Sequence, residues 1–301
     1  MQETLSTSSH SFPTHGWLGL ALIAIFWPLN WTVARDFPIT AYGFFPLWLG
    51  YCLTVDALAA FFHGTSLLTR SRRKYVGLFL VSAPAWWVFE VLNWRLQNWH
   101  YVGRELFTDL EYAILASLSF STVLPAVLGT AELLSGMGFL RRAGKWLVLP
   151  PTPRVTRIFA LAGAGMFLAM VIWPRTFFPF VWISLHWMLE PINIWLGNRS
   201  LAERTQHGDW RPVLALFLGV LITGFFWEMW NYFSFPKWVY TVPWGGFLKI
   251  FEMPLLGYGG YLPFALELFA LYHFTAGLLG QKKTDYITTA LFREENVERR
   301  T

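Results

Sequence analysis

Two short segments of the chain combine an acid, an amide and two aromatic residues in the same order. In the later segment the residues are Glu228, Asn231, Trp238 and Tyr240, and in the earlier one they are Glu90, Asn93, Trp99 and Tyr101. Residues three apart share one face of a helix, so each acid lies beside its amide. The aromatic residues follow in what we interpret as a short loop at the membrane interface.

Such a set of side chains suits chemistry that begins with a proton. A carboxylic acid in an apolar pocket has a raised pKa and can act as a general acid, and aromatic faces stabilise a developing cation. Together they fit the reaction of a lipophilic alkene, or recognition of a polar lipid headgroup. The structural alternative is that each Glu–Asn pair ties helix ends together by hydrogen bonds, as polar residues do in membrane bundles.

The composition indicates a membrane protein. Of the 301 residues, 55% are hydrophobic and 14% are charged, which is typical of polytopic membrane proteins rather than soluble domains. The net charge of +5 does not indicate nucleic-acid binding, because the excess lies in short segments between apolar runs. Cys52 is the single cysteine, so an intramolecular disulfide is excluded, and the scattered histidines predict no metal site. No cofactor is predicted.

Eight apolar runs are long enough to cross a bilayer, which takes about 20 residues each. We number them as spans one to eight: Trp17–Ala34, Ile39–Phe62, Tyr75–Trp94, Phe107–Leu134, Arg157–Pro174, Phe177–Gly197, Pro212–Tyr232 and Phe251–Leu279. The predicted fold class is therefore an all-α integral membrane protein with eight transmembrane helices. Residues 1–14 carry no Lys or Arg, are rich in Ser and Thr, and are predicted to be a disordered N-terminus.

The basic residues predict an orientation. Seventeen of the 23 Lys and Arg residues fall on one side of the predicted membrane, after spans two, four and six and in the C-terminal tail. By the positive-inside rule both termini are cytoplasmic, and the two Glu–Asn segments face the extracytoplasmic side of the cell membrane. Residues 281–301 form a charged tail, which we expect to lie on the cytoplasmic surface.

Further sequence matches predict an internal duplication. The matched pairs, in chain order, are Trp27-Pro28 with Trp173-Pro174, Phe44-Phe45-Pro46 with Phe177-Phe178-Pro179, and Leu124-Pro125 with Leu262-Pro263. Each half has four spans, and an even number preserves orientation. We therefore predict two parallel four-helix repeats, residues 15–140 and 157–280, joined by a cytoplasmic linker at residues 141–156.

Eight acids fall within the predicted spans, and they pair across the halves as Asp56 with Glu190, Glu90 with Glu228, Glu111 with Glu252, and Glu132 with Glu267. An ionised carboxylate at mid-bilayer costs roughly 2.5–3.5 kcal/mol. Because no Lys or Arg falls deep within a span, we expect the deeper acids to be protonated or held by polar groups of the bundle. The acids predicted near the outer surface are Glu90, Glu111, Glu228 and Glu252. The other four lie deeper, with His186 one helical turn from Glu190.

The order Trp227-Glu228, Trp238-Val239-Tyr240, Pro243 and Glu252 resembles the heterodimeric-type lycopene cyclase domain. That family also occurs as tandem membrane repeats. The resemblance implies acid-catalysed ring closure of a carotenoid-like polyene, with Glu111 and Glu252 at the family's acidic positions. This chain has one Glu where the family has a pair, and it has Glu228 where the family has Asp.

The leading hypothesis is a membrane enzyme of the cyclase or isomerase type that acts on a lipophilic, isoprenoid-like substrate. Its candidate catalytic residues are Glu90, Glu111, Glu228 and Glu252. Its candidate substrate-binding residues are Asn93, Asn231, Trp99, Tyr101, Trp238 and Tyr240. The expected partners are the lipid bilayer and this substrate, and the sequence leaves the oligomeric state open.

Two other classes compete with the enzyme hypothesis. A proton-coupled transporter built from the duplicated unit would use a proton path through the deeper polar residues, which are Asp56, Glu132, His186, Glu190 and Glu267. A non-catalytic subunit of a membrane assembly would show no polar cavity at all.

Overall fold

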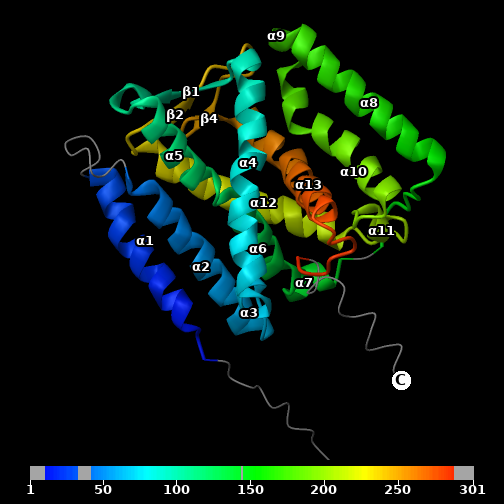
Figure 1. The fold of residues 1–301 in the computed structure, drawn as a ribbon, viewed down its shortest axis with the longest axis horizontal. Coiled ribbons are helices and arrows are strands. Elements are labelled where there is room, and N and C mark those ends of the chain that lie inside the picture. The colour runs from blue at the N-terminus through cyan, green and yellow to red at the C-terminus, as the bar shows by residue number, and fades with distance from the viewer. Residues whose placement is uncertain (1–10, 33–41, 144, 288–301) are drawn as a thin grey trace, which may run out of the picture.

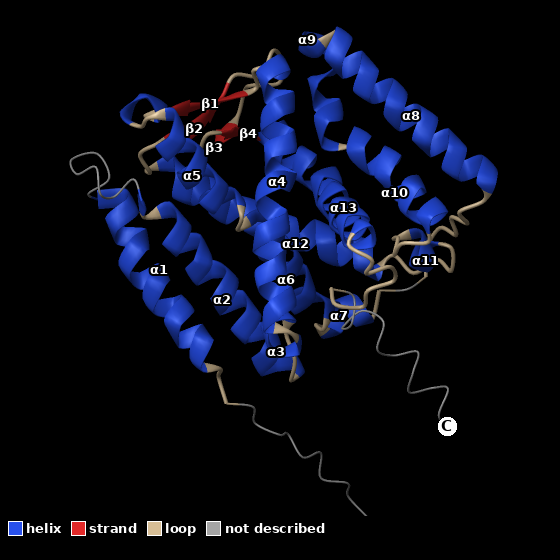
Figure 2. Cartoon of the chain, viewed as in Figure 1, coloured by secondary structure: helices blue, strands red, loops and turns tan. Residues whose placement is uncertain are grey.

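The computed structural model describes residues 11–32, 42–143 and 145–287, and most of these residues are helical (Figure 1, Figure 2). The earlier α-helices are α1 (Thr14–Thr32), α2 (Phe44–His63), α3 (Leu67–Arg70), α4 (Arg72–Leu96), α5 (Asp109–Phe120), α6 (Val123–Ser135) and α7 (Gly138–Arg141). The later ones are α8 (Pro153–Ile172), α9 (Pro174–Phe177), α10 (Ser184–Leu196), α11 (Ala202–Thr205), α12 (Arg211–Tyr232) and α13 (Leu255–Leu278). The 3-10 helices are η2 (Arg104–Leu106) and η3 (Phe178–Trp182).

The strands of the described chain are short and form two small antiparallel sheets. One sheet pairs β1 (Trp99–Val102) with β2 (Lys237–Tyr240), and the other pairs β3 (Lys249–Ile250) with β4 (Met253–Pro254). The sheet of β1 and β2 corrects the prediction of plain loops after the two Glu–Asn pairs. These segments are rich in aromatic and β-branched residues, which favour strands, and each finds a partner in the other half of the chain.

Within the described residues, six helices are long and apolar enough to cross a membrane, namely α2, α4, α5 taken together with α6, α8, α12 and α13. The prediction of a mostly helical, multi-pass membrane protein is thereby confirmed. Exposed apolar side chains on α8, such as Leu161 and Leu168, provide a surface suited to contact with lipid. Helix α1 covers most of predicted span one, and α10 covers most of predicted span six. Neither helix is among those that meet this criterion, so the count of eight spans stays a prediction.

Span six is interrupted. Residues 178–182 form η3, Ile183 leaves the helical conformation with φ −139° and ψ −27°, and α10 then runs for 13 residues. Such a helix is about 20 Å long, which is shorter than the roughly 30 Å of the hydrocarbon core. A carboxylate oxygen of Glu267, from α13, accepts a hydrogen bond from the backbone N–H of Leu185 at 3.0 Å. The interruption therefore brings a buried acid to the start of α10.

Span four is also divided, because α5 ends at Phe120 and α6 begins at Val123. The hydroxyl of Ser82, from α4, donates to the backbone oxygen of Phe120 at 2.6 Å and accepts from the backbone N–H of Leu124 at 3.0 Å. One buried side chain thus satisfies backbone groups on both sides of the break.

The helices are arranged with α1 and α2 side by side at one edge of the molecule, α8 and α10 at the opposite edge, and α4, α6, α12 and α13 between them (Figure 1). Helix α12 passes very close to α6 at Gly219, where an added Cβ would lie 2.8 Å from the backbone nitrogen of Ala131. The largest buried side chains of this interior include Trp48, Trp230 and Phe264. Close helix contact at glycine is the usual packing in membrane bundles.

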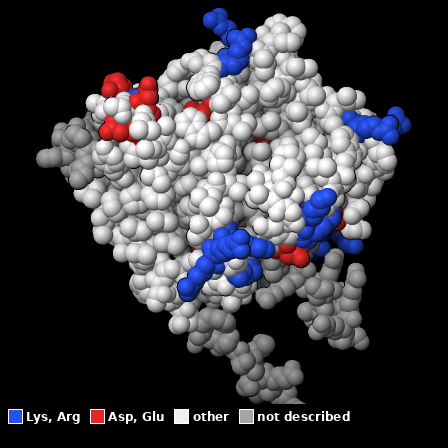
Figure 3. All heavy atoms as spheres, in the orientation of Figure 1, with Lys and Arg blue, Asp and Glu red and all other residues white. Residues whose placement is uncertain are grey.

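Charged residues gather at the two ends of the helices (Figure 3). Most of the Lys and Arg in this view collect at the end that carries α3, α7 and α11, with some acids among them; the opposite end shows acids near the start of α5 and further basic residues. The predicted disordered N-terminus (1–14) and the predicted charged tail (281–301) lie mostly outside the described residues, which omit 1–10 and 288–301. Thr14, the last residue of the predicted N-terminal segment, already begins α1.

Candidate functional site

Both Glu–Asn pairs lie in the last turns of membrane-spanning helices, Glu90 and Asn93 in α4 and Glu228 and Asn231 in α12. All four side chains are buried, with Glu228 and Asn231 both 0% exposed. Since a strand follows each helix after a short turn, the amide of each pair is positioned to reach the strand backbone.

The two asparagines hold the two strands in the same way. Asn231 donates from Nδ2 to the backbone oxygen of Trp238 at 2.8 Å and accepts at Oδ1 from the backbone N–H of Trp238 at 2.9 Å. Asn93 makes the same two contacts with Trp99, at 2.8 Å and 3.3 Å. The amides therefore position the strands, and through the strands they position the aromatic rings.

The strands pair in a symmetric register. Trp99 lies opposite Tyr240, and Tyr101 lies opposite Trp238. Trp238 follows Trp99 by 139 residues, and Tyr240 follows Tyr101 by the same interval. The Trp of each strand therefore lies opposite the Tyr of the other strand. This register brings the tyrosines and tryptophans of both segments to one place.

Glu90 accepts three hydrogen bonds on a single carboxylate oxygen. The donors to its Oε1 are Tyr101 Oη at 2.6 Å, Trp86 Nε1 at 2.9 Å and Trp99 Nε1 at 3.1 Å. All three donors are neutral aromatic side chains, and this chain of contacts holds three rings in fixed positions around one acid.

Glu228 has a related but different set of partners. Its Oε1 accepts from Tyr240 Oη and from Tyr261 Oη, each at 2.7 Å, and Trp238 Nε1 donates to the hydroxyl of Tyr240 at 2.9 Å. The second oxygen of Glu228, Oε2, is buried and has no hydrogen-bond partner among the described residues. With Oε1 occupied by two donors, Oε2 is the position at which this acid can carry a proton.

The two acids differ in the residue that lies one helical turn before each of them. Trp86 lies four residues before Glu90, and the position four residues before Glu228 is Gly224. A Cβ added at Gly224 would lie 2.7 Å from the ring of Tyr261. Tyr261, from α13, thus occupies space beside Glu228 that a side chain at position 224 would need.

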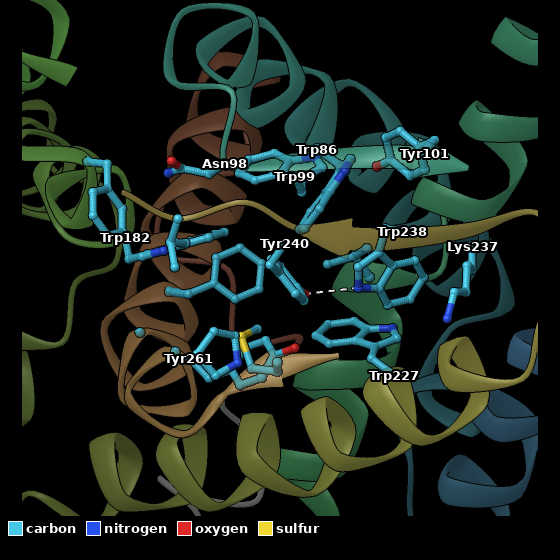
Figure 4. A pocket seen from close by; sticks show the side chains of 18 of the residues that line it. Trp86, Asn98, Trp99, Tyr101, Trp182, Trp227, Lys237, Trp238, Tyr240 and Tyr261 are labelled. Atoms are coloured by element: carbon cyan, nitrogen blue, oxygen red, sulfur yellow. Dashed lines mark hydrogen bonds between the residues drawn. The ribbon is translucent and has the colours of Figure 1, made fainter. Parts of the chain in front are cut away.

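These aromatic side chains line a pocket of about 560 Å³ (Figure 4). Its wall includes Trp86, Trp99, Tyr101, Trp227, Trp238, Tyr240 and Tyr261. Trp182 of η3 stacks on Trp99 with ring centroids 5.9 Å apart, so the interrupted span contributes to the same wall. Glu90 and Glu228 lie behind this wall and reach the pocket through the side chains that they hold.

The strand tyrosines are held as neutral phenols. Burial, reinforced by the adjacent carboxylate of Glu90, raises the pKa of Tyr101 well above its ordinary value. Burial and Glu228 do the same to the pKa of Tyr240. Each hydroxyl therefore remains a hydrogen-bond donor at any physiological pH.

The other two candidate catalytic acids lie elsewhere. Glu111 is exposed, and it closes a capping box with Thr108 at the start of α5, accepting from the Thr108 backbone N–H at 2.9 Å. Glu111 therefore caps the first turn of α5 and is not buried in the bundle with Glu90 and Glu228. Glu252 lies before α13 and forms an ion pair with Lys237, which lines the pocket. Glu252 therefore lies at the edge of the pocket, where its charge is balanced by Lys237.

The deeper acids each bind groups of the protein itself, as acids that stabilise the fold do. Asp56 accepts from the hydroxyl of Ser66 at 2.7 Å and from the backbone N–H of Leu68 at 2.9 Å. Glu190 accepts from the backbone N–H of Ala202 at 3.0 Å. Both acids therefore receive a hydrogen bond from the backbone of a short helix, α3 or α11.

Glu132 forms an ion pair with Arg70 of α3, which corrects the expectation that no cation reaches the deeper acids. A long side chain at a helix end can extend into the bundle, and Arg70 does so. Glu267 binds the start of α10, as described above, and His186 is buried near that point. Among the described residues, no hydrogen bond joins the side chains of two members of the candidate proton path; the backbone N–H of His186 donates to Glu267.

Sequence reasoning missed Trp86, Trp182 and Tyr261 as residues of the site. Trp86 lies one helical turn before Glu90, and that spacing could have identified it. Trp182 and Tyr261 come from other segments, and nothing in their neighbourhood in the sequence points to the acids. Comparison of the chain with protein-family models, with curated proteins and with solved structures finds no match.

Proposed function

We propose that this protein is a membrane enzyme that binds a lipophilic alkene, of the isoprenoid class, in the aromatic pocket and moves protons to and from it. The observation that carries the proposal is the pair of buried acids behind the pocket wall, each joined to the pocket by a tyrosine hydroxyl. A structural pair of hydrogen bonds would need no cavity, and this site has one of about 560 Å³.

In the proposed reaction Glu228 is the proton source. For this transfer the Glu228 proton moves to Oε1, and the hydroxyl of Tyr240 or Tyr261, which donates to that oxygen at rest, turns toward the alkene. The hydroxyl gives its proton to one carbon of the alkene as it receives the proton of Glu228, so the tyrosine stays neutral and Glu228 becomes a carboxylate. The aromatic faces stabilise the resulting carbocation. A neighbouring carbon then loses a proton along the reverse route, so the product is an isomer of the substrate, with a shifted double bond or a closed ring.

The proposal extends to the arrangement of the chain in the membrane. It includes eight spans in two parallel repeats, with the pocket in the extracytoplasmic half and both termini in the cytoplasm. The equivalent Asn–Trp contacts and the symmetric register of β1 and β2 support the duplication. The resemblance to the heterodimeric-type lycopene cyclase domain is compatible with this chemistry and remains a hypothesis.

The transporter alternative receives less support. Its candidate path consists of acids that hold backbone N–H groups or Arg70, and a group bound in this way is poorly suited to exchange protons in turn. The subunit alternative predicts no polar cavity, whereas the pocket is walled by hydroxyl and indole groups that lead to acids.

The test uses protein purified in mild detergent with the lipophilic molecules that it retains. After incubation in heavy water these molecules are extracted and analysed by mass spectrometry for deuterium bound to carbon. We expect incorporation with the wild type and its loss in Glu228→Gln. Glu105→Gln, the same change at an exposed position in η2, is the matched control and should incorporate normally. Equal incorporation by wild type and Glu228→Gln would rule out this mechanism.

A further inference from the structure

We infer that the pocket selects lipophilic cations, of the quaternary ammonium class, over neutral molecules of the same shape. The inference deepens the proposed function by naming the charge that the pocket favours, and it rests on the same pocket being a ligand site. It follows from the direction of the hydrogen bonds in the pocket wall.

Five hydrogen-bond donors of the wall point away from the cavity. The indole N–H groups of Trp86 and Trp99 and the hydroxyl of Tyr101 donate to Glu90. The hydroxyls of Tyr240 and Tyr261 donate to Glu228. Each of these donors is used by an acid behind the wall, so the same side chains present ring faces and acceptor oxygens to a ligand.

The remaining polar groups do not reverse this balance. Asn98 lines the pocket and is 3% exposed, and its amide carries both an acceptor and donors, so it favours neither sign of charge. Lys237 is the basic residue found in the described lining, and it is held in an ion pair with Glu252. The cation in the described lining is therefore already neutralised before an anionic ligand arrives.

Ring faces carry negative potential, and they attract a cation without requiring a hydrogen bond from it. The wall provides such faces from several sides, among them Trp86, Trp99, Trp182 and Tyr240 (Figure 4). The carboxylate of Glu90, which accepts three hydrogen bonds behind the rings, adds to the same potential. A quaternary ammonium group suits this environment because it has charge but no N–H group that would need an acceptor.

The experiment compares three probes of nearly equal size on full-length protein in neutral detergent. They are trimethyl(4-phenylbutyl)ammonium, the hydrocarbon in which carbon replaces its nitrogen, and 5-phenylpentanoate. Binding is measured by quenching of tryptophan fluorescence. We expect the cation to bind about tenfold more tightly than the hydrocarbon, an order of magnitude typical of desolvated cation–aromatic contacts, and the anion to bind most weakly.

Charge variants identify the source of the preference. Glu90→Gln should lower the affinity for the cation several-fold and leave the affinity for the hydrocarbon unchanged, and Glu105→Gln should alter neither. If Glu90→Gln does not fold, the comparison of the three probes on the wild type still decides the inference. Equal affinities for cation and hydrocarbon in the wild type, or tighter binding of the anion, would overturn the inference.

The two proposals can fail separately. A wild-type protein that prefers the cation but incorporates no deuterium retains the charge selectivity and loses the proposed catalysis. A protein that incorporates deuterium but binds the hydrocarbon as tightly as the cation retains the catalysis and loses the charge selectivity.

Discussion

His100 of β1 lies directly opposite Val239 of β2, and the flanking residues pair so that each half of the chain contributes the same contacts. The two residues are 139 positions apart, which is also the interval between the equivalent tryptophans and tyrosines. This pair therefore lies at the centre of the symmetric register. The consequence is that Glu90 and Glu228, from distant parts of the chain, stand behind one pocket.

Removing an asparagine side chain should weaken the fold at the corresponding strand. Asn231→Ala deletes two buried hydrogen bonds to Trp238, and Asn93→Ala deletes the same two bonds to Trp99 and a third from the backbone N–H of Asn98. At about 1 kcal/mol for each bond, we expect a loss of about 2 kcal/mol for Asn231→Ala and about 3 kcal/mol for Asn93→Ala. Unfolding in graded SDS would measure it. An unchanged unfolding curve in both variants would contradict the positioning role.

Tyr240 should resist ionisation in the folded protein. Its pKa is raised by burial and by Glu228, so titration of absorbance at 295 nm between pH 9 and about 11 should give the same curve for wild type and Tyr240→Phe. The raised folded pKa contributes stability that is complete below the unfolded value of about 10 and is lost as the pH rises through the folded pKa. The stability advantage of wild type over the variant should therefore decline only above about pH 10. If the wild type shows one more phenol that titrates near pH 10 than Tyr240→Phe does, Tyr240 ionises normally and the prediction is wrong.

The ion pair between Arg70 and Glu132 should matter most when only one partner is removed. Arg70→Met leaves the buried carboxylate of Glu132 without its cation, and we expect a loss of about 3 kcal/mol in the free energy of unfolding. The double variant Arg70→Met/Glu132→Leu should recover most of this loss, because no buried charge remains. Arg72→Met, at an exposed position of the next helix, is the control. Equal losses in the single and double variants would argue against a buried charge as the cause.

A single methyl group at position 224 should disturb the site. In Gly224→Ala the new Cβ would lie 2.7 Å from the ring of Tyr261, so the ring must shift and its hydroxyl must leave Glu228. We expect deuterium incorporation to slow about tenfold, which corresponds to roughly the 1.4 kcal/mol of one hydrogen bond. Gly165→Ala, on α8, adds the same methyl group where no atom lies within 4 Å. Similar rates in the two variants would remove Tyr261 from the mechanism.

The sequence was sufficient to predict the parts of the site that depend on local spacing. Long apolar runs predicted membrane helices, and six of the described helices meet that expectation. Glu228 and Asn231, three residues apart, lie on one helix face as predicted and point toward the strand that follows.

Other features depend on contacts between distant segments, and spacing could not predict them. The hydrogen bond from Tyr261 to Glu228 joins residues 33 positions apart, and the ion pair of Arg70 with Glu132 joins residues 62 apart. Glu111 is a different case, because Thr108 three residues before it is the signature of a capping box. That local signal predicts an exposed helix start, and it outweighs the apolar run that follows.

The symmetric pairing of β1 and β2 also limits how the two halves can change. Successive residues of a strand point to opposite faces, so inserting one residue into either strand would turn Tyr101 or Tyr240 away from its acid. The same insertion would shift the partner strand's pairing as well. A change of length in one strand must therefore be compatible with the other, which restricts how these two distant segments can vary.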